Sequence, residues 1–316
     1  MESVTSCQLS MPGREGFYDH ITANAKLGAR VVRQHSHAGQ SVVICGAGPS
    51  LADHAAQLPH ANHVWACNSA LPYLKGRKVR VTHGVSIDQG EAMLAPEEWA
   101  ETFNVHYLLA SCVHPSLTKH LKAKGRSFTW FHSYLGIPDP EGWVCPPTHS
   151  GEPISYEMYL YQTLYAPSVQ VGYGLNSVPR AVCLAIFMGF SSITVYGADC
   201  ACAPDGPPMP PLAHPDYPAW LNGLRMYADG RNAGCYGRSV MAEAPPGSID
   251  HRRWHTRADM LVSARHLLEL QKAYPDRITF VGDTLLNALQ GKDDAFWARM
   301  PALTGAGLVS TFGLAA

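Results

Sequence analysis

The stretch SVVICGAGPSL, residues 41–51, decides the fold that the rest of the chain follows. Its apolar run at residues 42–45, bounded by glycine, is typical of a buried parallel strand. The glycine turn leads into Pro49, which suits the first turn of a helix, so free backbone N–H groups and the helix dipole would point at one place. Such a turn either binds a phosphate or nucleotide or is an ordinary strand–helix connection. The candidate nucleotide-binding residues are Gly46, Ala47, Gly48 and Ser50; a dinucleotide fingerprint G-x-G-x-x-G would need glycine in place of Leu51.

The composition predicts a globular α/β protein. Of the 316 residues, 46% are hydrophobic and 16% charged, enough to bury a substantial core. The formal net charge is -1, so we expect no nucleic-acid surface, and no apolar run is long enough for a membrane span. The N-terminal residues have an early glutamate and no apolar core, unlike a signal peptide. Nine cysteines, an odd number, fit a reducing compartment, and we therefore expect a soluble cytoplasmic protein.

Polar residues follow the next two predicted strands. Strands are expected at residues 63–67 and 78–87, and Asn68 and Asp88 come directly after them. Asn68 lies about twenty residues past the glycine turn, where Rossmann-like folds place the side chain that binds a ribose hydroxyl; a turn asparagine is the alternative. Asp88 could hold a metal ion, a ribose or a substrate hydroxyl, or merely cap the next helix. Because ligands bind beyond the carboxyl ends of parallel strands, we expect both side chains in one crevice with the glycine turn.

A second helix–strand pair begins at Asn176 and Ser177, both good helix caps. An apolar helix is expected at residues 178–188, and a strand at 193–196 runs on to Asp199. If this helix leads into a parallel strand, its cap faces the same crevice as the glycine turn.

The chain is expected to have an N-terminal extension at residues 1–40, one domain at 41–300 and a loose tail at 301–316. Two Pro-rich segments, at 135–170 and 200–250, are expected to be insertions, the second a folded lid. Tyrosines in both segments favour folded structure over disorder. The sequence contains no C-x-x-C pair, so the strong ligand spacing of a zinc site is missing. Further helices are expected at 18–33, 51–58, 97–102, from about 249 to 274 and at 294–300, and further strands at 104–113, 126–134 and 277–281.

Basic residues cluster where the helix ending near residue 274 is expected to open. The segment IDHRRWHTRAD at residues 249–259 contains Arg252 and His255. Cations are disfavoured at a helix N-terminus, and an anionic ligand nearby would reverse that penalty. A solvated basic patch is the alternative.

Four segments in this order resemble one superfamily: GAGPSL, CNSA, SVPRAVCLAIFMGFSSITVYGAD, and a histidine-led helix followed by a strand. The superfamily contains the bacterial sialyltransferases that use CMP-sialic acid, the motility accessory transferases and the archaeal 6-hydroxymethylpterin diphosphokinases of the MptE-like group. The segment VSID, which ends at Asp88, is similar to a motif of the last two groups.

The resemblance implies a Rossmann-like, mostly parallel sheet with helices on both faces and a Pro/Gly-rich lid. It implies a nucleotide bound at residues 46–50 and at Asn68, with Asn176 and Ser177 contributing. By similarity to the sialyltransferases, His255 would be the general base that deprotonates an acceptor hydroxyl. Donors for the leaving phosphate could come from Arg252, Arg253 or Arg257.

The chain departs from the sialyltransferases at two places. Ala47 stands where they have asparagine, and Cys200-Ala201-Cys202 stands where tyrosines steady their leaving phosphate. Tyr217, Tyr227 or Tyr236 could reach in from the lid instead. These departures put sialic acid itself in question as the donor sugar.

The function expected first is therefore a glycosyltransferase that uses a nucleotide-sugar, with a CMP-type donor favoured and His255 as base. One alternative is a pyrophosphokinase of the 6-hydroxymethylpterin type, which would need Mg²⁺ between ATP phosphates, with Asp88 and Asp199 as candidate ligands. Another is a non-catalytic nucleotide-binding or assembly protein. The expected partners are a small-molecule donor and an acceptor, and a homo-oligomer is compatible with the sequence.

Overall fold

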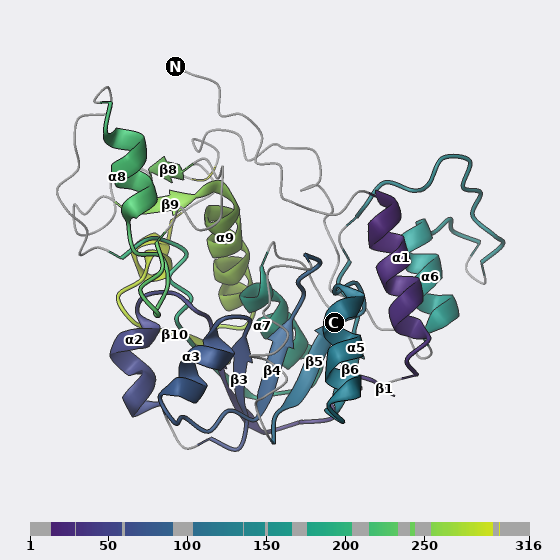
Figure 1. Ribbon diagram of the computed structural model, residues 1–316, viewed down its shortest axis with the longest axis horizontal. Helices are drawn as coiled ribbons and strands as arrows, with labels where there is room; N and C mark the ends of the chain where they lie inside the picture. The colour runs from purple at the N-terminus through teal and green to yellow at the C-terminus, as the bar shows by residue number, and fades with distance from the viewer. Residues whose placement is uncertain are drawn as a thin grey trace.

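An eight-stranded sheet, parallel throughout, forms the centre of the computed structural model (Figure 1). The structure describes residues 14–28, 30–58, 61–90, 104–134, 136–148, 151–165, 176–203, 215–232, 241–243, 254–292 and 297. The strands of the sheet are β1 (Arg30–Val31), β2 (Ser41–Cys45), β3 (Val64–Cys67), β4 (His83–Ser86), β5 (His106–Ala110), β6 (Phe128–Phe131), β7 (Ser192–Tyr196) and β10 (Ile278–Val281).

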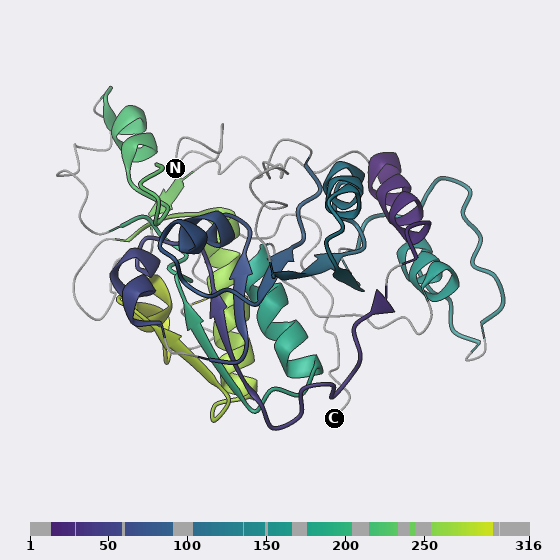
Figure 2. The same cartoon turned by 60° about the horizontal axis from the view of Figure 1, so that its bottom comes forward.

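Helices cover both faces of this sheet (Figures 1 and 2), which confirms the predicted fold class. Helices α2 and α3 lie on one face and α7 and α9 on the other (Figures 1 and 2). The helices are α1 (Arg14–Ala25), α2 (Leu51–His54) with a 3-10 turn (Ala55–Gln57), α3 (Ala70–Gly76), α5 (Pro115–Ala123), α6 (Tyr156–Leu164), α7 (Ser177–Phe187), α8 (Tyr217–Gly223), α9 (Ala258–Ala273) and α10 (Leu285–Leu289). None of the helices in these described ranges is long and apolar enough to cross a membrane.

Strand β2 lies where the order of the sheet reverses. The order is β1-β6-β5-β4-β3-β2-β7-β10, so the chain moves outward from β2 to β6 and then returns to β7 on the other side of β2. Four of the five residues of β2 are buried, because both of its faces are covered by helices. The crevice beyond the carboxyl ends of β2 and β7 is therefore the topological switch point, where open α/β sheets bind ligands.

The N-terminal helix is shorter than predicted and is followed by a strand. Gly28 ends α1 with a φ of 68°, and the chain then forms β1, the edge strand beside β6. Asn24 links α1 to the sheet: its Nδ2 donates to the carbonyls of Ser111 and Val113 at 3.0 and 2.8 Å. Residues 14–40 thus contribute both a strand and a covering helix to the main core.

The tyrosine-rich segment at 135–170 packs through α6. Tyr161 is fully buried, and its hydroxyl donates to Oε1 of Glu157 at 3.0 Å. The other oxygen of Glu157 accepts from the N–H of Gly136 at 3.0 Å, and Tyr165 donates to the carbonyl of Ile21 in α1. Hydrogen bonds satisfy these buried polar groups, so the segment joins the core through α1 and α6.

The helix predicted from about residue 249 begins later than expected. A strand, β9 (His255–Arg257), pairs antiparallel with β8 (Met241–Glu243) and precedes α9. His255 therefore lies on a strand rather than in the first turn of a helix. The helices α3, α5, α6, α8 and α10 were not predicted. The predicted helix at 97–102 lies outside the described residues, as do almost all of the closing helix at 294–300 and about half of the lid at 200–250.

Histidines lie side by side across the amino ends of three neighbouring strands. The ring of His83 lies 6.0 Å from that of His63 and 5.6 Å from that of His106, centroid to centroid. Burial, with the neighbouring histidines adding to it, lowers the pKa of His83 to about 3. Burial also lowers the pKa of His63 and of His106. The folded chain therefore keeps these imidazoles neutral below the pH at which an unfolded chain protonates them.

Acid is expected to destabilise the fold through His83. The unfolded chain binds a proton near pH 6.5 and the folded chain does not, so this contribution is present above pH 6.5 and is lost as the pH falls toward 3. Between pH 7.5 and 5.0 the loss from His83 is about 2 kcal/mol. Urea unfolding of the wild type and of His83→Phe at both pH values measures this loss of unfolding free energy. The variant should lose about 2 kcal/mol less than the wild type; equal losses would contradict the assignment.

Candidate functional site

Two glycine turns, one after β2 and one after β7, lie against each other at the switch point. The N–H of Gly46 donates to the carbonyl of Tyr196 at 2.8 Å, and that of Gly48 donates to the carbonyl of Gly197 at 2.9 Å. A Cβ on Gly46 would overlap the carbonyl oxygen of Gly197. Glycine at position 46 is therefore needed for the close approach of the two turns, which together form the floor of the crevice.

Asp199 caps the start of α2 across this floor. Its carboxylate accepts from the N–H of Ser50 at 3.1 Å and from the Ser50 hydroxyl at 2.9 Å. Asp199 is 6% exposed, and no cationic side chain among the described residues pairs with it. Burial raises the pKa of Asp199 to about 6, against the opposite effect of the Ser50 hydrogen bonds. The amides of Gly46, Gly48 and Ser50, which were expected to be available for phosphate, are thus bonded within the protein.

The predicted ribose-binding residue, Asn68, follows β3 directly and has a left-handed backbone conformation. Its φ is 44°, in the left-handed region, and its N–H donates to the carbonyl of Val85 at 3.0 Å. Its side-chain Oδ1 is buried and makes no hydrogen bond to any residue that the structure describes. A buried acceptor without a partner is costly, and a ligand hydroxyl would satisfy it.

The start of α7 presents a second unsatisfied group. The Oδ1 of Asn176 caps the helix by accepting from the N–H of Val178 at 3.1 Å, and its Nδ2 donates to the hydroxyl of Ser263 at 2.8 Å. Asn176 is therefore committed to joining α7 to α9. Ser177 is 4% exposed, and within the described part of the chain its hydroxyl has no hydrogen-bond partner. The positive end of the dipole of α7 lies at the same place.

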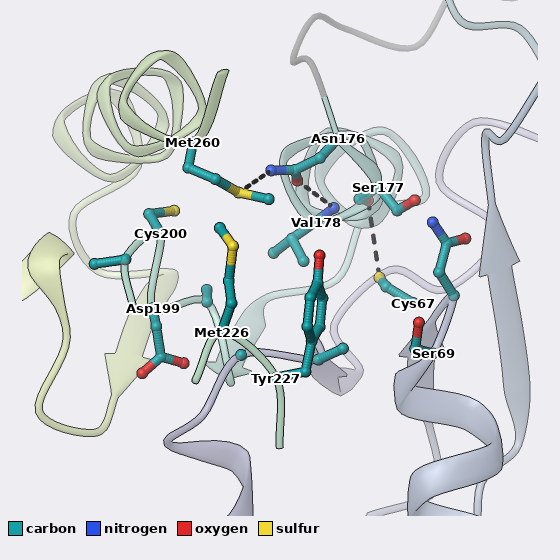
Figure 3. Close-up of a pocket in the computed structure, with 15 residues that line it drawn as sticks. Cys67, Ser69, Asn176, Ser177, Val178, Asp199, Cys200, Met226, Tyr227 and Met260 are labelled. Atoms are coloured by element: carbon teal, nitrogen blue, oxygen red, sulfur yellow. Dashed lines mark hydrogen bonds between the residues drawn. The ribbon is translucent and has the colours of Figure 1, made fainter. Parts of the chain in front are cut away.

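These groups line one open pocket, whose empty space, mouth included, is about 660 Å³ (Figure 3). Six of the predicted residues are in its wall: Ala47, Gly48, Asn68, Asn176, Ser177 and Asp199. Among the described residues the wall contains no lysine, arginine or histidine, and Asp199 is its one carboxylate. The described part of the wall therefore offers a ligand neutral polar groups and a helix terminus.

The other predicted residues lie outside this wall. Gly46 and Ser50 support the pocket from below through the contacts given above. Asp88 does not line it; its Oδ1 accepts from the N–H of Gly90 at 3.1 Å, and burial raises its pKa. His255 also does not line it, and its ring packs edge-on against Trp220 at 4.7 Å. Arg252 lies outside the described residues.

Two methionines of the pocket wall, Met226 and Met260, were not among the predicted site residues. Met226 and Tyr227 lie next to the glycine turn, because the N–H of the nearby Ala228 donates to the carbonyl of Ala47 at 2.9 Å. Met260 of α9 lies opposite, beside Asn176 (Figure 3). Tyr227 was one of three lid tyrosines expected to reach in, and its side chain points into the pocket (Figure 3). Nothing in the sequence marks the methionines, because isolated methionines in loops and helices are common in cores.

Fold and site together define a Rossmann-like α/β protein with a pocket at its switch point. The family model described as "6-hydroxymethylpterin diphosphokinase MptE-like" matches residues 16–205, more than half of the chain. The chain belongs to this MptE-like family, as its motifs predict.

A solved structure supports the same fold. The MAf glycosyltransferase from Magnetospirillum magneticum AMB-1 matches with a TM-score of 0.53 and 13% sequence identity. The match covers 85% of this chain and 38% of the glycosyltransferase, so the chain spans well under half the length of that protein. No curated protein matches the chain significantly.

Proposed function

We propose that this protein is a nucleotide-dependent transferase, and specifically a glycosyltransferase that moves a sugar from a nucleotide-sugar to an acceptor hydroxyl. The observation that carries the proposal is the pair of buried, unsatisfied oxygens of Asn68 and Ser177 in one switch-point pocket. Buried polar atoms without partners are rare in folded proteins unless a ligand or water completes them. The fold shared with a glycosyltransferase agrees with this function.

The chemistry of the pocket favours a donor of low charge. Asn68 would accept from a ribose hydroxyl, and the phosphate would lie at the start of α7, where Ser177 and the helix dipole favour an anion. A CMP-type sugar donor carries a single phosphodiester charge, whereas a triphosphate carries three or four. Because the described wall offers no cationic side chain, it suits the CMP-type donor better.

Transfer requires a base near the acceptor. The base takes the proton of the acceptor hydroxyl, whose oxygen then attacks the sugar carbon. The bond from that carbon to the phosphate oxygen breaks, and the nucleotide leaves with the electron pair. We assign the base to His255, because β9 is tied to the residues after β7 by the N–H of Cys202, which donates to the carbonyl of His255 at 2.8 Å. Cys200 and Ala201, just before this link, line the pocket. Arg252 would add a donor for the leaving phosphate.

The second candidate is a pyrophosphokinase, the activity for which the MptE-like family is described. It would transfer a pyrophosphoryl group from ATP to an alcohol and would need Mg²⁺ held by carboxylates. Asp199 is the carboxylate that the wall offers, and within the described ranges no group of three or more His, Cys, Asp or Glu is placed to hold a metal ion. This candidate therefore has less support than the glycosyltransferase.

Calorimetric titration with CMP, CDP, UDP, GDP and ATP, each with and without Mg²⁺, tests the proposal. Metal-independent binding of a cytidine nucleotide is expected. Binding of ATP alone, and only with Mg²⁺, would favour the pyrophosphokinase. No binding of any nucleotide would overturn both and favour an assembly protein that retains the fold without the chemistry.

Replacing Ser177 by alanine is expected to weaken nucleotide binding by about 10- to 100-fold, because a hydrogen bond to a charged phosphate contributes about 1.5–3 kcal/mol. Calorimetry with the nucleotide that binds the wild type measures the change. Ser191→Ala is the matched control, since the Ser191 hydroxyl donates to the carbonyl of Gln40 at an exposed position before β7. Equal affinities for Ser177→Ala and the control would show that the phosphate is not at the start of α7.

A further inference from the structure

We propose that Asp199 determines which nucleotides the pocket accepts: its carboxylate occupies the anion position at the glycine turn and restricts the pocket to ligands with one phosphate group. This inference rests on the proposed function, because it specifies the ligand class of the same pocket. It makes Asp199 a specificity-determining residue.

The carboxylate already fills the place that a phosphate would take. In nucleotide-binding turns of this kind, backbone N–H groups after the strand bind a phosphate oxygen. Here the N–H and the hydroxyl of Ser50 both donate to Asp199. The carboxylate of Asp199 also lies directly against Gly48, since a Cβ at position 48 would overlap Oδ2 of Asp199. A phosphate could enter the turn only by displacing the carboxylate of the protein.

Among the residues that the structure describes, no positive charge neutralises Asp199. No lysine or arginine of the described chain forms an ion pair with it, and none lines the pocket. Asp53, in α2, adds a second negative charge nearby and contributes to the raised pKa of Asp199. That pKa, about 6, still leaves the group mostly ionised at pH 7.5. Every phosphate added to a ligand therefore increases the repulsion inside a partly buried, poorly screened site.

One phosphate has a separate place to bind. The hydroxyl of Ser177 and the start of α7 lie on the other side of the pocket, and the carboxylate of Asp199 points away from them (Figure 3). A single phosphate at α7 gains the helix dipole and the Ser177 hydroxyl. For a second and a third phosphate, the amides of Gly46, Gly48 and Ser50 at the glycine turn are already bonded, and the described wall has no cationic side chain.

Titration of the wild type and of Asp199→Asn with CMP, CDP and CTP at pH 7.5, in EDTA and in Mg²⁺, tests this assignment. In EDTA the wild type should bind CMP at least about tenfold more tightly than CTP, with CDP between them. Asparagine keeps the size of the side chain and an oxygen for the N–H of Ser50 but removes the charge. In Asp199→Asn the preference for CMP should fall to within about threefold, through tighter binding of CTP.

Asp276→Asn is the matched control, because it makes the same change to an exposed carboxylate between α9 and β10, outside the pocket wall. It should retain the CMP-to-CTP ratio of the wild type within about twofold. If Asp199→Asn does not fold, the wild-type series alone decides, since tighter binding of CTP than of CMP in EDTA would overturn the inference.

The remaining outcomes separate the inference from the function on which it rests. An unchanged CMP-to-CTP ratio in Asp199→Asn would overturn the role of Asp199 and leave the proposed function standing. Tight CTP binding that requires both Mg²⁺ and Asp199 would also overturn it, and would make Asp199 a metal ligand. Failure of all three nucleotides to bind the wild type would overturn the proposed function and this inference with it.

Discussion

Replacing His255 by alanine is expected to lower the rate of sugar transfer by about 10²- to 10⁴-fold, the usual contribution of a general base. Nucleotide affinity should stay within about twofold of the wild type, because His255 does not line the pocket that holds the donor. The ring of His255 packs against Trp220, so its removal leaves a gap beside β9 rather than in the pocket. Steady-state transfer rates and calorimetric Kd values, measured on the same preparations, separate the two effects.

Two further variants make this result specific. His120→Ala changes a histidine in the last turn of α5, which lies away from the pocket, and should leave transfer unchanged. His255→Gln keeps a polar side chain of similar length but cannot take a proton at neutral pH, so it should not restore activity. If His255→Ala reduced nucleotide affinity as strongly as it reduced the rate, a structural role would replace that of the base.

Replacing Gly46 by alanine is expected to destabilise the fold by about 3 kcal/mol or more. The added Cβ would overlap the carbonyl oxygen of Gly197 and would come within 2.9 Å of Cγ2 of Val178. The first of these neighbours is backbone in a tight turn, with Gly197 at a φ of 62°, and it cannot move aside without breaking the contact between the two turns. Urea unfolding measures the difference in unfolding free energy between the wild type and Gly46→Ala. Nucleotide binding by this variant should also be lost.

Gly76→Ala is the matched control for this prediction. Gly76 ends α3, and a Cβ there would meet nothing within 4 Å. Alanine at this position should be neutral or stabilising by up to about 1 kcal/mol, because it reduces the entropy of the unfolded chain. A Gly46 variant as stable as the Gly76 variant would show that the two glycine turns do not pack as described.

Local pattern was sufficient for the elements around the switch point. The apolar run of β2, the glycine turn and the apolar helix α7 that leads into β7 each have strong short-range signals, and all three lie where the sequence predicts them. The polar residues that follow these strands were found for the same reason: parallel strands end at one edge, so Asn68 and Asp199 meet in one pocket. Asn176 and Ser177 were found because a helix needs a cap.

The same reasoning was insufficient where a contact depends on residues distant in the chain. Two residues of β1 form a strand because β6 lies beside them, and isolated residues 30–31 have no strand signal of their own. The strand β9 forms against β8, which moves His255 from a helix to a strand. Asp88 follows β4 as predicted, but its carboxylate accepts from the N–H of Gly90 and does not line the pocket.

The sequence by itself therefore determined the parallel α/β class and the edge of the sheet where a ligand would bind, because these follow from short-range periodicity, glycine turns and helix caps. The family was indicated by the resemblance of four segments to known members. Only the tertiary structure decided how the groups at that edge are used. Asp199 and Ser50 are 149 positions apart, and their hydrogen bonds turn an expected phosphate site into an internal cap. At the start of α7, Asn176 is held by α9, whereas the buried hydroxyl of Ser177 has no hydrogen-bond partner among the described residues. Hydrogen-bond satisfaction is settled across the whole fold, and no local pattern specifies which groups remain for a ligand.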